Sequence, residues 1–165
     1  MDNITRYFSL GLIGGILTVL PGCKGAEELP AKEIRAELRQ FGGLELPRKA
    51  EGLRAILSHS RDREIFVKFE TDSEGIKHVM KTFGGPGVES KTLDANDLKE
   101  ITKFGGSLFP QPLEWQEMIG VCLFDEKSLS SGLLLERMPP RANQVGWKVF
   151  IEDKSKTVYI FAYFI

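Results

Sequence analysis

The chain has 165 residues, with 22 basic and 23 acidic side chains and a formal net charge of -1. Hydrophobic residues make up 42% and charged residues 27%, which is ordinary for a folded domain and excludes a disordered tail, a collagen-like repeat and a polytopic membrane protein. Binding to nucleic acid needs an excess of Lys and Arg, which this chain lacks, and we do not expect its two Cys and two His to form a zinc site. We therefore expect neither a nucleic-acid partner nor a cofactor.

An uncharged run, residues 8–22, follows Arg6 near the N-terminus. The run is shorter than the roughly 20 apolar residues that a helix needs to span a bilayer. Pro21 would also end a helix within it. This length is typical of the apolar core of a secretory signal peptide. We therefore expect residues 1–22 to be a signal peptide.

The end of this run, Leu20-Pro21-Gly22-Cys23, resembles the lipobox of bacterial lipoproteins, in which a Leu lies three positions before a Cys and a small residue directly precedes it. The resemblance covers only the first 23 residues. It implies cleavage before Cys23 and lipidation of that residue on its sulfur and amino group. Anchoring gains about 0.8 kcal/mol per buried methylene, so the implied partner of acylated Cys23 is a lipid bilayer.

The same resemblance implies a location in a bacterial cell envelope, at the outer membrane or at the extracytoplasmic face of the plasma membrane. Lys24 favours the outer membrane, because lipoproteins retained at the inner membrane often have Asp after the lipidated Cys. Residues 23–29 would then form a lipidated tether. The alternative is a buried N-terminal helix or an uncleaved anchor, with Cys23 as an ordinary thiol.

The remaining residues, 30–165, are enough for a single domain with a hydrophobic core. Apolar residues recur at helical spacing in several segments, most clearly at Ile76, Val79, Met80 and Phe83 after the capping-box spacing of Thr71-Asp72-Ser73-Glu74. Residues 109–112 are expected to be extended because they contain two prolines. The spacing predicts helices over 30–41, 48–57, 73–83, 94–104 and 113–119.

Alternation of apolar and charged residues makes 65–70 the clearest internal strand. The final third is typical of antiparallel sheet, with 153–156 as a hairpin loop. Candidate strands there are 120–124, 133–138, 146–152 and 157–165. We therefore predict an α+β fold, an antiparallel sheet of about four to five strands packed with several short helices.

Few residues suggest catalysis. His59 lies in a polar connection. His78 falls off the apolar stripe of its helix, so we expect it to face solvent. No Gly-x-Ser-x-Gly nucleophile elbow is present, and we assign no catalytic, cofactor or metal-binding residues. Cys122 lies in the apolar run 120–124 and is expected to be a buried, inert thiol. If Cys23 were not lipidated, a Cys23–Cys122 disulfide would be an alternative.

The C-terminal segment 157–165 is apolar on both faces. A central strand that is covered on both sides would show this pattern. The functional alternative is that the face of Tyr159, Phe161 and Tyr163 is open and binds a partner or an apolar ligand, since tyrosines are enriched at such sites. These three residues are the candidate partner-binding face.

Leu46-Pro47 with Ala50, the strand 65–70, and Phe109-Pro110 with Trp115 are similar to small bacterial envelope proteins of unknown function, and this resemblance implies no activity. We expect a membrane-anchored lipoprotein whose domain is a non-enzymatic binding or interaction module with a protein partner in the envelope. The alternative is an envelope enzyme, hydrolase-like, with a site dispersed in the sequence. A deep pocket with converging titratable groups would favour the enzyme, and a flat apolar patch would favour the interaction module.

Overall fold

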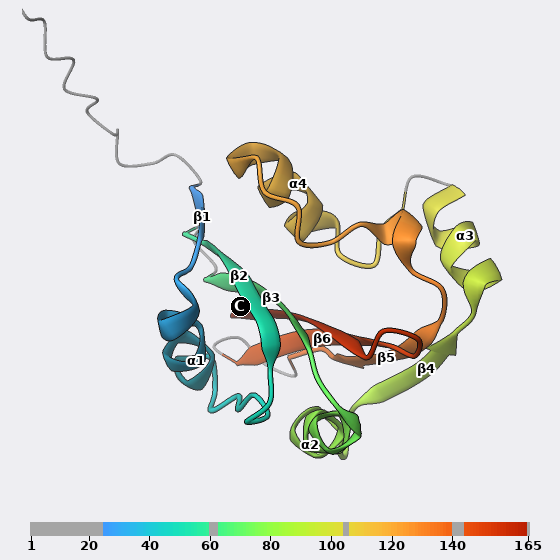
Figure 1. Cartoon of the computed structure of the whole chain (residues 1–165), viewed down its shortest axis with the longest axis horizontal. Helices are drawn as coiled ribbons and strands as arrows, with labels where there is room; N and C mark the ends of the chain where they lie inside the picture. The colour runs from blue at the N-terminus through green and yellow to red at the C-terminus, as the bar shows by residue number, and fades with distance from the viewer. Residues whose placement is uncertain (1–24, 60–62, 104–105, 140–143, 165) are drawn as a thin grey trace, which may run out of the picture.

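The computed structural model describes residues 25–59, 63–103, 106–139 and 144–164. Seven strands in these ranges form one sheet in the order β1-β2-β3-β7-β6-β5-β4, and all neighbouring strands are antiparallel (Figure 1). The strands are β1 (Ala26–Glu28), β2 (Glu51–Ser58), β3 (Glu64–Glu70), β4 (Glu89–Leu93), β5 (Gly132–Arg137), β6 (Val145–Glu152) and β7 (Thr157–Phe164). The predicted α+β class and the antiparallel sheet are confirmed, and the sheet is larger than the four to five strands expected.

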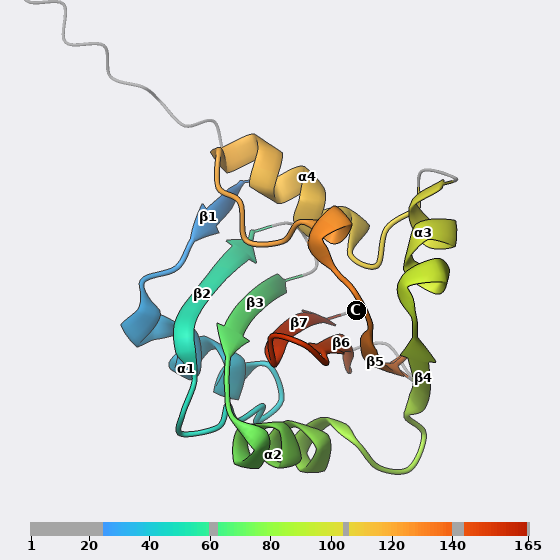
Figure 2. The same ribbon diagram turned by 45° about the vertical axis from the view of Figure 1, so that its right-hand side comes forward.

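Helices cover both faces of the sheet (Figure 2). α1 (Ala31–Gln40) and α2 (Ser73–Phe83) pack on one face. α3 (Ala95–Lys103), α4 (Pro110–Ile119) and the loop that follows α4 pack on the other. The described part of the chain therefore has three layers with the sheet in the middle, and two separate hydrophobic clusters fill the spaces between them.

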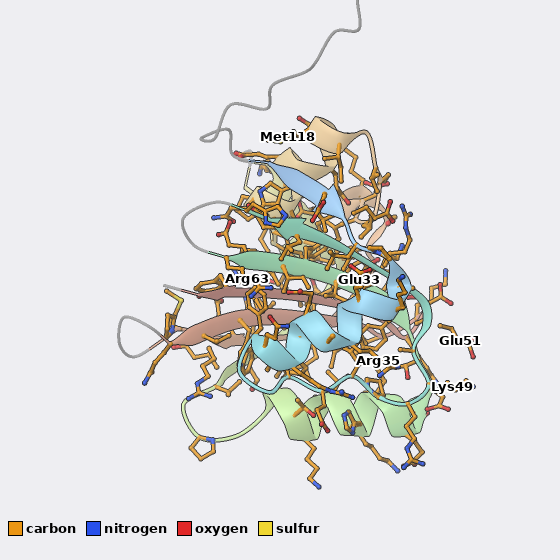
Figure 3. All side chains as sticks on the ribbon, turned by 90° about the vertical axis from the view of Figure 1, so that its left-hand side faces the viewer. Glu33, Arg35, Lys49, Glu51, Arg63 and Met118 are labelled. Atoms are coloured by element: carbon orange, nitrogen blue, oxygen red, sulfur yellow. The ribbon has the colours of Figure 1, made fainter. Side chains whose placement is uncertain are left out.

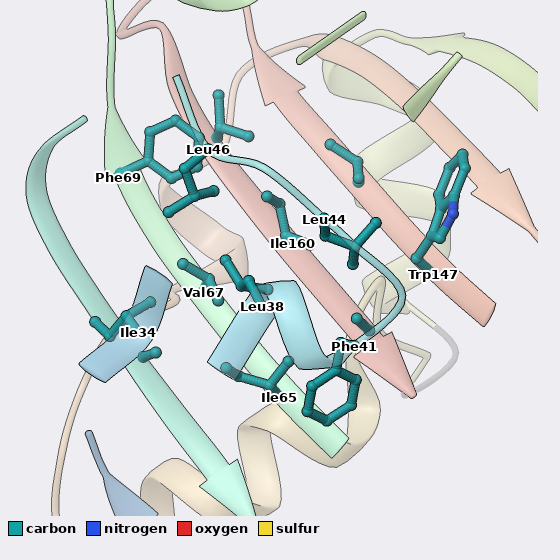
Figure 4. Packing of buried hydrophobic residues seen from close by; sticks show 14 of the residues in the cluster. Ile34, Leu38, Phe41, Leu44, Leu46, Ile65, Val67, Phe69, Trp147 and Ile160 are labelled. Carbon is teal, nitrogen blue, oxygen red and sulfur yellow. The ribbon is translucent and has the colours of Figure 1, made fainter. Parts of the chain in front are cut away.

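The cluster under α1 and α2 is mainly aliphatic, and we call this side of the sheet the aliphatic face (Figure 4). Ile65 and Val67 of β3 point to it and are fully buried with Ile34 and Leu38 of α1. Ile34 and Leu38 are four residues apart, so they form one stripe on the helix. The helical spacing in the sequence therefore identified the surface by which α1 packs.

α2 begins within the predicted capping box, one residue later than its spacing places the N-cap. The N-cap is Asp72, whose carboxylate accepts a hydrogen bond of 2.9 Å from the backbone N–H of Gly75. Val79 and Phe83 face the sheet, and the Phe83 ring meets the edge of Trp147 at 5.3 Å between centroids. The predicted helix over 73–83 is confirmed.

The cluster under α3 and α4 is rich in aromatic rings, and we call this side the aromatic face. Phe66 of β3 is fully buried there, with its ring centroid 5.2 Å from that of Phe109 and 5.9 Å from that of Phe124. Tyr159 of β7 lies 5.1 Å from Phe124 and 6.4 Å from Phe150. Rings from three strands and from the segments around α4 thus form one continuous cluster.

The predicted helix over 48–57 is wrong, because this segment contains β2. Four consecutive residues from Ala55 to Ser58 are buried, as happens when a strand is covered on both faces. Such a run also satisfies helical spacing, so the periodicity was ambiguous. Gly52, with φ of +58°, lies at the irregular start of the strand, where the pairing with β3 shifts register.

The predicted strand over 120–124 is also wrong. Gly120 ends α4 in the left-handed conformation, with φ of +68°, and the chain then continues as a loop. The Gln116 side chain makes the hydrogen bonds that a neighbouring strand would otherwise make. Its amide donates to the Phe124 carbonyl at 2.9 Å. Its Oε1 accepts from the backbone N–H of Leu123 at 2.6 Å and from that of Phe124. Likewise, the segment expected to be extended at 109–112 begins α4, with Pro110 at its first position.

Two edge strands were not expected. β1 lies within 23–29, the predicted tether, and it pairs with β2, while Leu29 is buried. β4, at the other edge, exposes four of its five residues and therefore shows no strand-like alternation. Charged side chains on both strands suit sheet edges, which must not pair with other chains. The other predicted strands, the hairpin and the helices that became α1 and α3 are confirmed.

Candidate functional site

A cavity of about 530 Å³ lies beside α1 and α2, on the aliphatic side of the molecule. Small-molecule sites have volumes of roughly 300–1,000 Å³. The connection between α1 and β2 runs between the two helices and supplies half of the lining (Figure 3). The lining residues are Arg35, Arg39, Leu44, Glu45, Leu46, Pro47, Arg48, Lys49, Asp72, Glu74, Gly75 and His78.

The connection takes its course because α1 ends on two glycines. Gly42 and Gly43 have φ of +91° and +75°, values that other residues rarely adopt. The Gly43 N–H donates to the Arg39 carbonyl at 2.8 Å, which satisfies one of the free carbonyls at the helix end. The chain then turns back and buries Leu44 and Leu46 against the aliphatic core. The charged residues of the connection, Glu45, Arg48 and Lys49, line the cavity.

Arg35 fixes this connection to α1. Its guanidinium donates to three backbone carbonyls, those of Leu46 at 3.2 Å, Pro47 at 2.8 Å and Arg48 at 3.3 Å. A planar guanidinium carries five N–H donors in a rigid arrangement, so one side chain can hold several consecutive carbonyls. Arg35 therefore sets the shape of the cavity wall while its positive charge stays without a carboxylate partner among the described residues.

The carboxylates of the cavity are already engaged. Asp72 caps α2, and its Oδ2 lies 3.5 Å from the Lys49 ammonium. The hydrogen bond from the Gly75 amide, with the nearby Lys49 charge, holds the pKa of Asp72 below its ordinary value of 3.8. Glu74 pairs with Lys77 one turn along α2, at 2.7 Å. The acidic side chains therefore serve the start of α2 and its surface.

His78 lies on the cavity wall, which differs from the expectation that it faces solvent. It is half-buried, and its Nε2 lies 3.1 Å from the Glu45 carbonyl oxygen. His59, in the connection after β2, is exposed, and its Nε2 lies 2.8 Å from Oε1 of Glu27 in β1. The two histidines thus have separate partners, and only His78 belongs to the cavity.

Cys23 and the whole predicted signal peptide, 1–22, lie outside the described residues. Cys122 is exposed in the loop after α4, so the prediction of a buried thiol is wrong. The reason is that Gln116 holds the backbone of Leu123 and Phe124 and turns their side chains inward, which leaves Cys122 at the surface. Arg54 of β2 donates to the Cys122 carbonyl at 3.4 Å.

The three residues of the candidate partner-binding face point to the aromatic side of the sheet. Tyr159 is 4% exposed and Phe161 is 7% exposed, with its ring 5.8 Å from Trp115 of α4. Tyr163 is half-buried, and its hydroxyl donates to the Met138 sulfur at 3.3 Å. Of the three, Tyr163 therefore keeps the side-chain surface that a partner could reach.

Burial shapes the acidity of these tyrosines. Burial, with smaller contributions from Glu152 and Glu70, raises the pKa of Tyr159 from 10.0 to about 12. Burial also raises the pKa of Tyr163 above its ordinary value. Both hydroxyls are therefore neutral at physiological pH, and the pair supplies polar but uncharged groups to this side of the sheet.

The cavity was missed in the sequence because its parts are far apart. Arg35 and Arg39, four residues apart on a helix face, were a local signal, but they also fit a solvated polar stripe. Nothing local indicates that the connection after α1 would lie against α2, or that His78 would contact a carbonyl 33 residues away. The site is a product of tertiary packing.

Three further findings bear on the site. Within the described ranges, no group of three or more His, Cys, Asp or Glu side chains is placed to hold a metal ion. None of the helices in the same ranges is long and apolar enough to cross a membrane. No protein-family model, no curated protein and no solved structure matches this chain.

Proposed function

We propose that this protein is a bacterial envelope lipoprotein, anchored through lipidated Cys23, whose folded domain is a non-enzymatic module that binds a small molecule. The observation that carries the binding part is the cavity between α1, α2 and the connection 41–50. The lipobox resemblance of residues 20–23 supports the anchoring part.

The lining of the cavity combines the two chemistries that a binding site needs. Leu44, Leu46 and Pro47 supply apolar surface, and charged groups around them supply orientation. The wall is also held in place before any ligand arrives, because Arg35 fixes the connection through three hydrogen bonds. A preformed wall reduces the entropy that binding must overcome.

Titratable groups do meet in this cavity, which is the feature we associated with an enzyme. Their contacts, however, are structural: Asp72 caps a helix, Glu74 pairs with Lys77, and His78 contacts a backbone carbonyl. A nucleophile, a base and a group that orients the base must lie within hydrogen-bond reach of one another. Binding therefore fits the observed contacts better than catalysis does, and turnover of a bound molecule would support the enzyme instead.

Lipidation at Cys23 would place the domain close to a membrane. Two residues, Lys24 and Gly25, lie between Cys23 and Ala26, the first residue of β1, and the three extended residue steps from Cys23 to Ala26 span about 10 Å. The β1 edge of the sheet would then lie beside the lipid surface. In this arrangement the protein would present its cavity to molecules in the envelope.

The anchoring is tested by replacing each cysteine in turn. We expect Cys23→Ser to abolish membrane partitioning and to remove the added mass of the acyl chains. Cys122→Ser should change neither, since Cys122 is an exposed thiol in the folded domain. Unchanged partitioning and mass in Cys23→Ser would contradict the proposal.

The binding is tested by titrating the isotope-labelled full chain with small aromatic compounds that carry a negative, a positive or no charge. We expect at least one to shift backbone amide resonances of residues 44–49 and 72–78 in a saturable way. Shifts confined to other segments, or none with any compound, would contradict a binding role for this cavity.

A further inference from the structure

We propose that the ligand of this cavity is a small organic anion, whose phosphate or carboxylate group is held by Arg48 and Arg39 beside Arg35. This inference rests on the proposed function, because it names the chemical class that the same cavity would bind.

The cavity has more positive charge than its own carboxylates neutralise. Four of the lining residues are Arg or Lys, and Lys49 alone among them lies within ion-pair distance of a carboxylate of the described residues, at 3.5 Å from Asp72 and 3.8 Å from Glu51. Arg39 and Arg48 have no ion-pair partner in the described part of the chain. Arg35 is held by carbonyl oxygens, which leave its full charge in place.

The negative side chains do not offset this excess. Asp72 is shared between the helix cap and Lys49, and Glu74 is paired with Lys77. Glu45 is exposed and is the one lining carboxylate that has no charged partner among the described residues. Among the described residues, the lining therefore has one carboxylate without a charged partner and three arginines without a carboxylate partner.

The arginines are brought together by the fold. Arg35 and Arg39 are four residues apart on α1, so they lie on the same side of the helix, where like charges repel. The Arg48 backbone touches the Arg35 guanidinium at 3.3 Å. Arg39 has a structural reason to be cationic, because it lies in the last turn of α1, where the helix dipole favours positive charge. The dipole gives no such reason for Arg48, which is exposed and lines the cavity.

The size of the cavity favours an anion with an organic body. A volume of about 530 Å³ suits a small organic molecule rather than a lone phosphate. Leu44, Leu46 and Pro47 give that body an apolar wall, while arginine is the side chain that binds phosphate and carboxylate with two parallel hydrogen bonds. The combination favours an anion attached to an apolar or aromatic group.

The test is a titration of the full chain with phenyl phosphate, observed through backbone amides and the arginine side-chain resonances. We expect shifts at residues 44–49, and we expect Arg48→Gln to raise Kd by about tenfold or more, as the loss of a charge-assisted hydrogen bond predicts. Arg137→Gln is the matched control, because it removes the same charge from an exposed arginine outside the cavity and should leave Kd unchanged. Equal weakening by both variants would mean that net charge alone drives binding, which overturns the proposal.

Other probes separate this inference from the proposed function. If benzylamine or benzyl alcohol shifts the cavity amides and phenyl phosphate does not, the anion class is wrong and the binding function stands. If no probe shifts them, both fail. Vesicles of phosphatidylglycerol and of phosphatidylcholine distinguish the source when they are tested with the Cys23→Ser chain, which has no lipid anchor. Binding to the first alone, lost when Arg48→Gln is added, assigns the anion to a lipid headgroup. Binding of free phenyl phosphate without vesicle binding assigns it to a soluble molecule.

Discussion

The two faces of the sheet are buried by different means. On the aliphatic face, two amphipathic helices pack regular stripes of Ile, Leu, Val and Phe against the strands, and the cavity lies between these helices and the connection 41–50. On the aromatic face, rings from Phe66, Tyr159 and Phe150 meet rings carried by the irregular segments around α4. The first face depends on local periodicity, whereas the second depends on contacts between residues far apart in the sequence.

This difference separates the face that is closed by packing from the face that carries the cavity. The aromatic face is closed by Phe109, Trp115 and Phe124, and it contains most of the ring-to-ring contacts of the described residues. The aliphatic face leaves room between α1 and α2, which the connection 41–50 fills only in part. A domain with one fully packed face can leave a hollow on the other without losing its core.

Adjacent residues of β3 give the largest test of this comparison. Phe66 and Val67 are both fully buried but point to opposite faces. Phe66→Ala would remove a ring that touches three others, and we expect it to lower the free energy of unfolding by about 4 kcal/mol. Val67→Ala removes two methyl groups and should cost about 2 kcal/mol. Urea unfolding measures both, and equal losses would show that the two faces contribute alike.

The loop after α4 gives the next largest effect. Gln116 is 7% exposed and makes three hydrogen bonds to the backbone of Leu123 and Phe124. Gln116→Ala would leave these backbone groups buried without partners, and we expect a loss of about 3 kcal/mol. Gln111→Ala, on the exposed side of the same helix, is the control and should be close to neutral. Hydrogen exchange should speed up at the amides of Leu123 and Phe124, and unchanged protection there would contradict the role of Gln116.

How far the sequence could predict the molecule follows from the same division. α1, α2, β3 and the hairpin around 153–156 depend on spacing and caps within a few residues, and all were predictable. β2 was not, since a strand buried on both faces loses the alternation that distinguishes it from a helix. The loop 120–124 depends on one glutamine side chain, and the cavity depends on α2 lying against the connection after α1. Neither leaves a periodic pattern.

A smaller effect is expected beside the cavity, at Gly75. A Cβ added to Gly75 would lie 1.8 Å from Oγ1 and 2.9 Å from Cβ of Thr71. The Thr71 side chain can therefore pack against the first turn of α2 only because position 75 has no side chain. Alanine is the better helix former by about 1 kcal/mol, yet we expect Gly75→Ala to lose about 1–2 kcal/mol through this clash. Combining it with Thr71→Ala should recover part of the loss, whereas Lys81→Ala on the same helix is a neutral control. Stabilisation by Gly75→Ala alone would mean that α2 shifts without cost.

The last effect is confined to alkaline pH and to the aromatic face. Because burial raises the pKa of Tyr159 from 10.0 to about 12, the unfolded chain loses this proton before the folded chain does. Below pH 10 the hydroxyl is neutral in both states and its contribution to the free energy of unfolding is fully present. As the pH rises from 10 to 12, this free energy should fall. Tyr159→Phe keeps the ring, which lies 5.8 Å from the Lys68 ammonium, but removes the titration. The measurement is the difference in unfolding free energy between wild type and Tyr159→Phe across this range, alongside the difference in tyrosinate absorbance. A constant difference would show that the hydroxyl ionises equally in both states, and the closed packing of the aromatic face around Tyr159 would then be wrong.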